Sequence, residues 1–146
     1  MVLRKLVYAL FGLALIACLP GSLQAQYFGR QKVQYEDFDW RVMHAERFDI
    51  YYYPEELEAT KDAARMAERW YSRLSRAFQH EFRKKPLIFY ADHPDFQQTN
   101  VIQSMLSEGT GGVTEGLKNR VIMPYTGVYR DNDHVLGHEL VHVFQY

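Results

Sequence analysis

The prediction of the fold starts from residues 133–144, which read DHVLGHELVHVF. Within this segment His138 and His142 are four positions apart, slightly more than one helical turn, so a helix would present both imidazole rings on one face. Neutral imidazole is a good zinc ligand, and two from one helix leave room for a third protein ligand and a water. Glu139 follows the first histidine, where its carboxylate can reach that water. The spacing therefore predicts a zinc site with hydrolytic chemistry.

The residues around this pattern sharpen the prediction. In a chain of this length the five-residue pattern alone arises by chance on the order of once in a few hundred sequences. The positions between and beside the ligands are all uncharged: Val135, Leu136, Gly137, Leu140, Val141, Val143 and Phe144. They suit a buried helix in a dry cleft, where a charge would lose its hydration or compete for zinc. The alternative is a core helix with two hydrogen-bonded histidines and a surface glutamate.

Residues 1–25 have the pattern of a signal peptide. Two basic residues precede the uncharged run 6–19, and Ala25 offers a cleavage point. We expect cleavage there and export to the periplasm or outside the cell, with no transmembrane span in the mature chain because no second apolar run follows. The letters LIAC, which end at Cys18, also resemble a lipobox, so lipidation of Cys18 is the alternative. The mass of the mature protein distinguishes the two.

The composition of the chain limits its partners and its class. Residues 26–146 are enough for one small domain. The chain has 17 Lys and Arg against 18 Asp and Glu, without a basic run, which argues against nucleic acid as a partner. Cys18 is the only cysteine, so no intramolecular disulfide is predicted.

Hydrophobic periodicity predicts an α/β (α+β) domain with a mixed sheet. In chain order the elements are one or two strands within 40–53, an amphipathic helix over 55–82, a buried strand over 87–90, a helix over 94–106, a strand pair within 113–123, and the histidine-bearing helix. Asp131 or Asp133 is the expected cap of that last helix. A polar cluster of Asp92, His93 and Asp95 is more typical of a helix cap than of a metal site.

Glycines surround the short strand Val113, Thr114 and Glu115. This strand is predicted to lie at a sheet edge, where an extended peptide substrate could pair with its backbone. A flexible surface loop is the alternative. His134 lies one turn before His138 and is expected to line the pocket or donate a supporting hydrogen bond. It is a poor third ligand, because successive turns move about 5 Å away from one metal.

The element order, ending in HELVH at 138–142, resembles the N-terminal half of a zincin metallopeptidase domain. More closely, QYFG at 26–29, YEDFDW at 35–40 and FDIYY at 48–52 are similar to a group of exported bacterial proteins. That group carries a peptidase-MA-like, gluzincin-type domain, commonly followed by a TolB-like β-propeller. The resemblance covers residues 26–146. It implies that His138 and His142 bind Zn²⁺, that Glu139 is the general base, and that the substrate is a peptide or protein.

One departure from the family pattern concerns the third ligand. Gluzincins take it from a glutamate on a later helix, and this sequence ends at Tyr146. We expect a truncated domain that is inactive alone, with the ligand and a β-propeller in a longer protein. Otherwise the ligand would come from Glu108, Glu115, His134 or His93.

Two other functions stay open at this stage. The first is a catalytically degenerate peptidase-like module with a binding or envelope-assembly role, although the intact Glu139 argues against it. The second is a metal-free exported structural domain.

Overall fold

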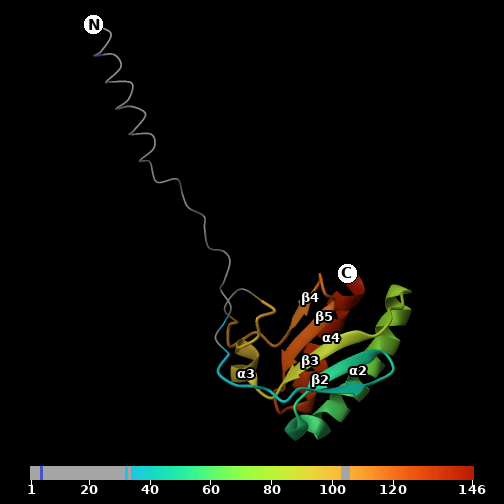
Figure 1. Cartoon of the computed structure of the whole chain (residues 1–146). Coiled ribbons are helices and arrows are strands. Elements are labelled where there is room, and N and C mark those ends of the chain that lie inside the picture. The colour runs from blue at the N-terminus through green and yellow to red at the C-terminus, as the bar shows by residue number, and fades with distance from the viewer. Residues whose placement is uncertain (1–3, 5–31, 33, 103–105) are drawn as a thin grey trace. The chain divides into compact units, whose positions relative to one another are not determined.

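The computed structural model describes Arg4, Lys32, residues 34–102 and residues 106–146 (Figure 1). The elements below belong to one compact unit, Gln31–Tyr146. The predicted signal peptide, residues 1–25 with Cys18, lies outside the described residues except at Arg4.

The described residues form a five-stranded mixed sheet with the order β1-β2-β3-β5-β4. Its strands are β1 (Arg41–His44), β2 (Phe48–Tyr52), β3 (Lys85–Tyr90), β4 (Val113–Glu115) and β5 (Arg120–Pro124). The three central strands run parallel, with Leu87 opposite Ile50 on one side and Val121 on the other, and β1 and β4 pair antiparallel at the two edges. Continuous apolar central strands need cover on both faces of a sheet. The predicted α/β class and mixed sheet are confirmed.

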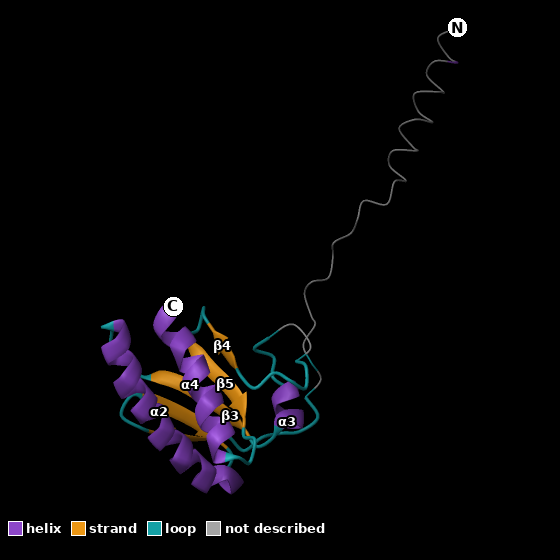
Figure 2. Ribbon diagram, turned by 180° about the vertical axis from the view of Figure 1, so that it is seen from behind, coloured by secondary structure: helices purple, strands orange, loops and turns teal. Residues whose placement is uncertain are grey.

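Helices α2 (Leu57–Phe78) and α4 (Tyr129–Gln145) cover one face of the sheet, and Figure 2 shows both in front of the strands. Side chains that alternate along the strands meet them there, including Ile50, Leu87 and Val121. On the other face a second cluster packs around Tyr90, and it includes residues of the short helix α3 (His93–Gln97). A single 3-10 turn, η1 (Pro54–Glu56), precedes α2. None of the described helices has the length and apolar composition needed to cross a membrane.

The long helix is shorter than predicted, by two residues at its start, where η1 lies, and by four residues at its end. It ends at Phe78, because Gln79 adopts a left-handed conformation with φ of 51° and its N–H donates to the carbonyl of Ser75. Phe82 lies beyond this end and still packs in the core, with its ring centroid 4.8 Å from that of Phe144. Phe82 fits the apolar spacing of the helix although it lies outside it, which is why the predicted helix extended too far.

The second helix is also shorter than predicted, ending at Gln97 instead of residue 106. Asp92 caps it as expected, since its carboxylate accepts from the N–H of Asp95 at 2.9 Å. Gln98 is buried after the helix, and its Oε1 accepts from the N–H of Tyr35 at 2.8 Å. That bond attaches the irregular segment before β1 to the end of α3, a constraint that periodicity does not reveal.

The predicted cap of the last helix was wrong. This helix begins at Tyr129, so Asp131 and Asp133 both lie inside its first turns. The Oδ1 of Asp133 instead accepts from the indole N–H of Trp70 at 3.1 Å and from the guanidinium of Arg69 at 3.2 Å. The side chain expected to begin α4 therefore binds it to α2.

The closest approach of α4 to α2 is at Gly137. A Cβ at this position would lie 2.5 Å from two ring atoms of Trp70, so the helix rests directly on the indole. Each residue turns an α-helix by about 100°, so Glu139 points about 200° away from that contact. This rotation directs Glu139 toward the sheet edge at β4.

We predict that Gly137→Ala lowers the free energy of unfolding by about 1–2 kcal/mol. Because the contact would be as short as 2.5 Å, overpacking against Trp70 should cost about 2–3 kcal/mol, the upper part of the usual range. The helix propensity that alanine gains, about 1 kcal/mol, offsets only part of this cost. The indole N–H donates to Asp133, and the guanidinium of Arg73 lies over the ring, 5.2 Å from its centroid, so the ring is held in place. Urea denaturation measures the change.

Gly109→Ala is the matched control, because nothing lies within 4 Å of a Cβ at Gly109. It should change stability by no more than about 0.5 kcal/mol. Equal effects of the two variants would mean that α4 does not rest on Trp70.

Candidate metal centre

One turn of α4 brings the two predicted ligands together. The Nε2 atoms of His138 and His142 are 3.3 Å apart, and their rings cross at 82°. Two nitrogens bound to one tetrahedral zinc, each at about 2.0–2.1 Å, would be separated by about 3.3 Å. Hydrogen bonds from N–H groups are typically shorter, about 2.9–3.0 Å. The pair therefore fits a shared zinc ion better than a direct hydrogen bond.

Gln145 orients the second histidine. Its Oε1 lies 3.1 Å from the Nδ1 of His142, so an Nδ1–H can donate to it and leave the Nε2 lone pair free. Such an outer hydrogen bond sets the tautomer of a metal-binding histidine. Gln145 is not among the residues predicted from the sequence, although its position three residues after His142 on the same helix was a signal for it.

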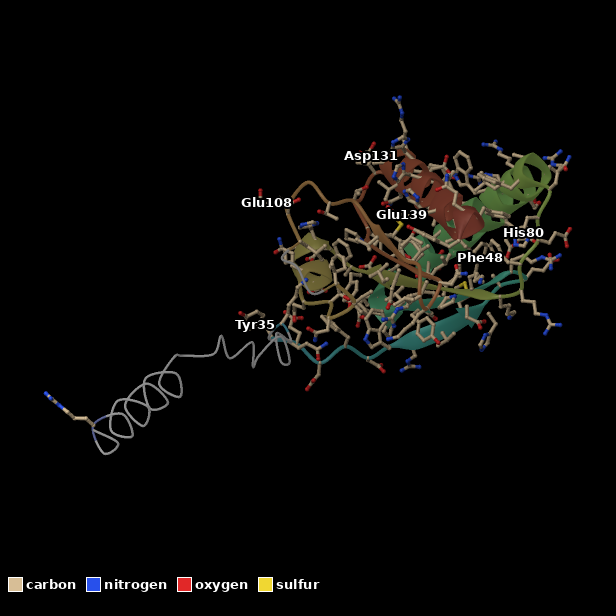
Figure 3. The ribbon with its side chains drawn as sticks, turned by 90° about the horizontal axis from the view of Figure 1, so that it is seen from above. Tyr35, Phe48, His80, Glu108, Asp131 and Glu139 are labelled. Carbon is tan, nitrogen blue, oxygen red and sulfur yellow. The ribbon has the colours of Figure 1, made fainter. Side chains whose placement is uncertain are left out.

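Glu139 occupies a different environment from its neighbour. Its side chain is buried, with a relative exposure of 7%, whereas His138 is exposed. The hydroxyl of Thr114 lies 2.7 Å from Oε2 and 3.0 Å from the backbone oxygen of Glu139. A buried carboxylate needs such partners to compensate for lost hydration. Figure 3 shows Glu139 on α4, whereas Glu108 projects outward from the loop before β4.

A cleft of about 340 Å³ opens between α4 and the segment that leads into β4. Thr110, Gly111 and Gly112 form one wall, and His134, Val135, His138 and Glu139 form the other. The walls approach so closely that a Cβ on Gly112 would lie 3.0 Å from the Cγ of Glu139. His134 thus lines this cleft, and the glycines permit the close approach of its two walls.

No protein-family model, curated protein or solved structure matches this chain. The case for a function therefore rests on the residues and geometry of the site.

In the part of the chain that the structure describes, no third ligand joins the two histidines. Among the described residues, no three His, Cys, Asp or Glu side chains form a group that could hold a metal ion. Glu115 pairs with Arg120. Val113, two residues before Glu115 on the same strand face, packs in the cluster on the sheet face away from α4. His93 lies against Phe96 in that same cluster.

Two further expectations can be compared with the site. β4 is an edge strand of the described sheet, as predicted for residues 113–115. Most of the uncharged positions of the helix are buried, as expected, and they serve its contacts with α2 and the sheet. His138 is exposed and His142 half-buried in the described part of the chain. A dry cleft around the metal therefore stays a prediction.

We predict that Gln145→Ala weakens zinc binding by about tenfold, the cost typical of losing an outer hydrogen bond to a ligand. His138→Ala or His142→Ala should remove measurable binding, because each deletes a direct donor. Competition with a chromogenic chelator gives the affinities.

His134→Ala is the control, because His134 lines the cleft without contributing to the pair. Its zinc affinity should stay within about twofold of the parent protein, well below the cost of losing a ligand. A loss as large as that of His142→Ala would make His134 a ligand and contradict this assignment.

Proposed function

We propose that this protein is a zinc-dependent hydrolase of peptide bonds. The observation that carries the proposal is the convergence of two Nε2 atoms at 3.3 Å beside the buried carboxylate of Glu139. A structural metal site has no use for an acid–base group at this position. Zinc when bound supplies Lewis acidity, which polarises a carbonyl and favours loss of a proton from water.

Glu139 provides the proton transfer in this mechanism. Its carboxylate accepts a proton from the attacking water, so that an O–H bond of water breaks as an O–H bond on the carboxyl group forms. The same group then delivers that proton to the leaving amine and returns to the carboxylate state. Because its side chain is held against Gly112 and Thr114, little reorganisation is needed during these transfers.

The edge of the sheet favours an extended peptide as the substrate. β4 pairs with β5 on one side, and among the described strands nothing pairs with its other side. Backbone groups on such an edge can bind an added strand. The cleft lined by Gly111, Gly112 and His138 lies beside it, so a peptide paired with β4 would pass close to the histidines.

We further propose that the domain is zincin-like, of the exported gluzincin type that the sequence resembles. In this proposal a glutamate outside residues 1–146 completes the zinc site, and a β-propeller follows in the full protein. The mixed sheet, the long helix α2 and the edge strand beside α4 are compatible with it.

We predict that Glu139→Gln retains zinc and loses hydrolysis. The amide preserves the shape of the side chain and removes no metal ligand, but it cannot accept a proton from water. General-base assistance contributes about 10²–10⁴-fold, so cleavage should fall by at least that factor. Zinc content and the cleavage of dye-labelled unfolded casein are measured together, in a protein that carries the complete site.

Glu108→Gln is the control, since it makes the same chemical change at an exposed loop position. Full activity in Glu139→Gln would rule out the mechanism, and loss of zinc would reassign Glu139 as a ligand. A parent protein that binds zinc and cleaves no peptide would favour the degenerate binding module.

A further inference from the structure

We infer that Thr114 is a positioning residue, whose hydroxyl holds the carboxylate of Glu139 in the orientation needed for proton transfer. The inference deepens the proposed function and rests on it for its catalytic consequence. The contact itself is a property of the fold that can be measured without activity.

The hydrogen-bond distances favour the side-chain oxygen as the partner of Thr114. A threonine hydroxyl has one hydrogen, and two oxygens of Glu139 lie within its reach. The distance to Oε2 is 2.7 Å and that to the backbone oxygen is 3.0 Å. Bonds from O–H to a carboxylate oxygen are short, about 2.5–2.7 Å, and stronger than neutral ones. The hydroxyl therefore donates mainly to Oε2.

Packing reinforces this hydrogen bond. A Cβ on Gly112 would lie 3.0 Å from the Cγ of Glu139 and 3.2 Å from the Cβ of Met123, so the backbone at Gly112 packs closely beside the glutamate side chain. Two residues of one segment, Gly112 and Thr114, thus contact the side chain at its middle and at its end. Together they restrict the rotamers of the buried glutamate.

The two carboxylate oxygens of Glu139 have different surroundings. Oε2 accepts from Thr114, whereas Oε1 makes no hydrogen bond to a described residue and is not among the buried unpaired atoms. Glu139 also lines the cleft. Oε2 is therefore occupied by the hydrogen bond from Thr114 of the sheet, and Oε1 is the oxygen that can accept the proton of water.

The position of Thr114 explains why the edge strand would affect the chemistry. Thr114 is paired in register with Val121 of β5, so the sheet fixes the backbone that carries its hydroxyl. The histidines, by contrast, are fixed by α4. Relative placement of base and ligands therefore depends on the packing of α4 against β4, and Thr114 is the hydrogen-bonding link between them.

The first experiment measures the side chain of Glu139 directly. In protein labelled with ¹³C-glutamate, side-chain couplings report whether one rotamer dominates, and Glu139→Gln assigns the signal. The parent protein and Thr114→Ser, which keeps the hydroxyl, should show one rotamer. Thr114→Val, which has the same shape without the donor, should show averaged couplings.

Thr110→Val is the matched control for this measurement. It removes a hydroxyl on the same segment, but that hydroxyl lies 3.0 Å from the hydroxyl of Ser107, whereas the hydrogen bonds to Glu139 come from Thr114. Its Glu139 couplings should equal those of the parent protein. Identical rotamer populations in Thr114→Val and the parent protein would overturn the inference, whether or not the protein is active.

The second experiment separates positioning from folding in a protein with the complete zinc site. For casein cleavage, Thr114→Val should lower kcat by about 10–100-fold, the range typical of supporting hydrogen bonds at metal sites. KM and zinc affinity should stay within about twofold, because binding groups are unchanged. Thr114→Ser should recover most of kcat.

A purely structural role predicts a different result. In that case Thr114→Val would reduce zinc affinity, kcat and stability together, and the serine variant would offer no selective recovery. That pattern would overturn the inference. An inactive parent protein would contradict the proposed function, and the rotamer measurement would then decide the inference alone.

Discussion

The contact of Gly137 with Trp70 is the constraint on which the candidate site depends. The absence of a side chain at Gly137 lets α4 rest on the indole ring, and the indole N–H donates to Asp133 of the same helix. Packing and hydrogen bonding thus fix both the rotation and the position of α4 along its axis. With the rotation fixed, Glu139 points into the interior and toward β4, while His138 stays exposed at the cleft.

The site combines a local and a long-range part. The histidine pair is local, since two side chains four residues apart on a helix meet whatever the rest of the fold does. The base is held from a distance, by Thr114 on a strand 25 positions earlier in the chain. Burial of a carboxylate is unfavourable without such a partner, so the fold must supply one. The general-base function we propose consequently depends on the sheet edge as much as on the helix.

Sequence periodicity was sufficient for the parts of the molecule whose pattern is local. Alternation predicted β2, the continuous apolar run predicted the buried β3, and the four-residue spacing predicted the paired histidines. The glycine-flanked segment predicted the strand pair β4 and β5, because glycines mark turns and close approaches. Such patterns record which face of an element is buried, and the structure bears them out.

Periodicity failed where a side chain has a partner far away in the sequence. Phe82 extended the apolar spacing past the end of α2, although it reaches the core from outside the helix. Asp133 was predicted to cap the helix because its partner, Trp70, lies 63 residues earlier and no local pattern indicates their contact. Thr114 was predicted only as part of a substrate strand, since nothing local reveals its bond to Glu139. Tertiary contacts decide these roles, and the local pattern of a single sequence does not show which distant residues come into contact.

The central claim is that α4 presents His138 and His142 to one zinc ion. X-ray absorption at the zinc K edge tests it most directly, because multiple scattering from imidazole rings counts the histidines bound to the metal. We predict two imidazole nitrogens at about 2.0–2.1 Å from the zinc, with other oxygen or nitrogen donors completing the coordination. A zinc environment with one imidazole or none would contradict it.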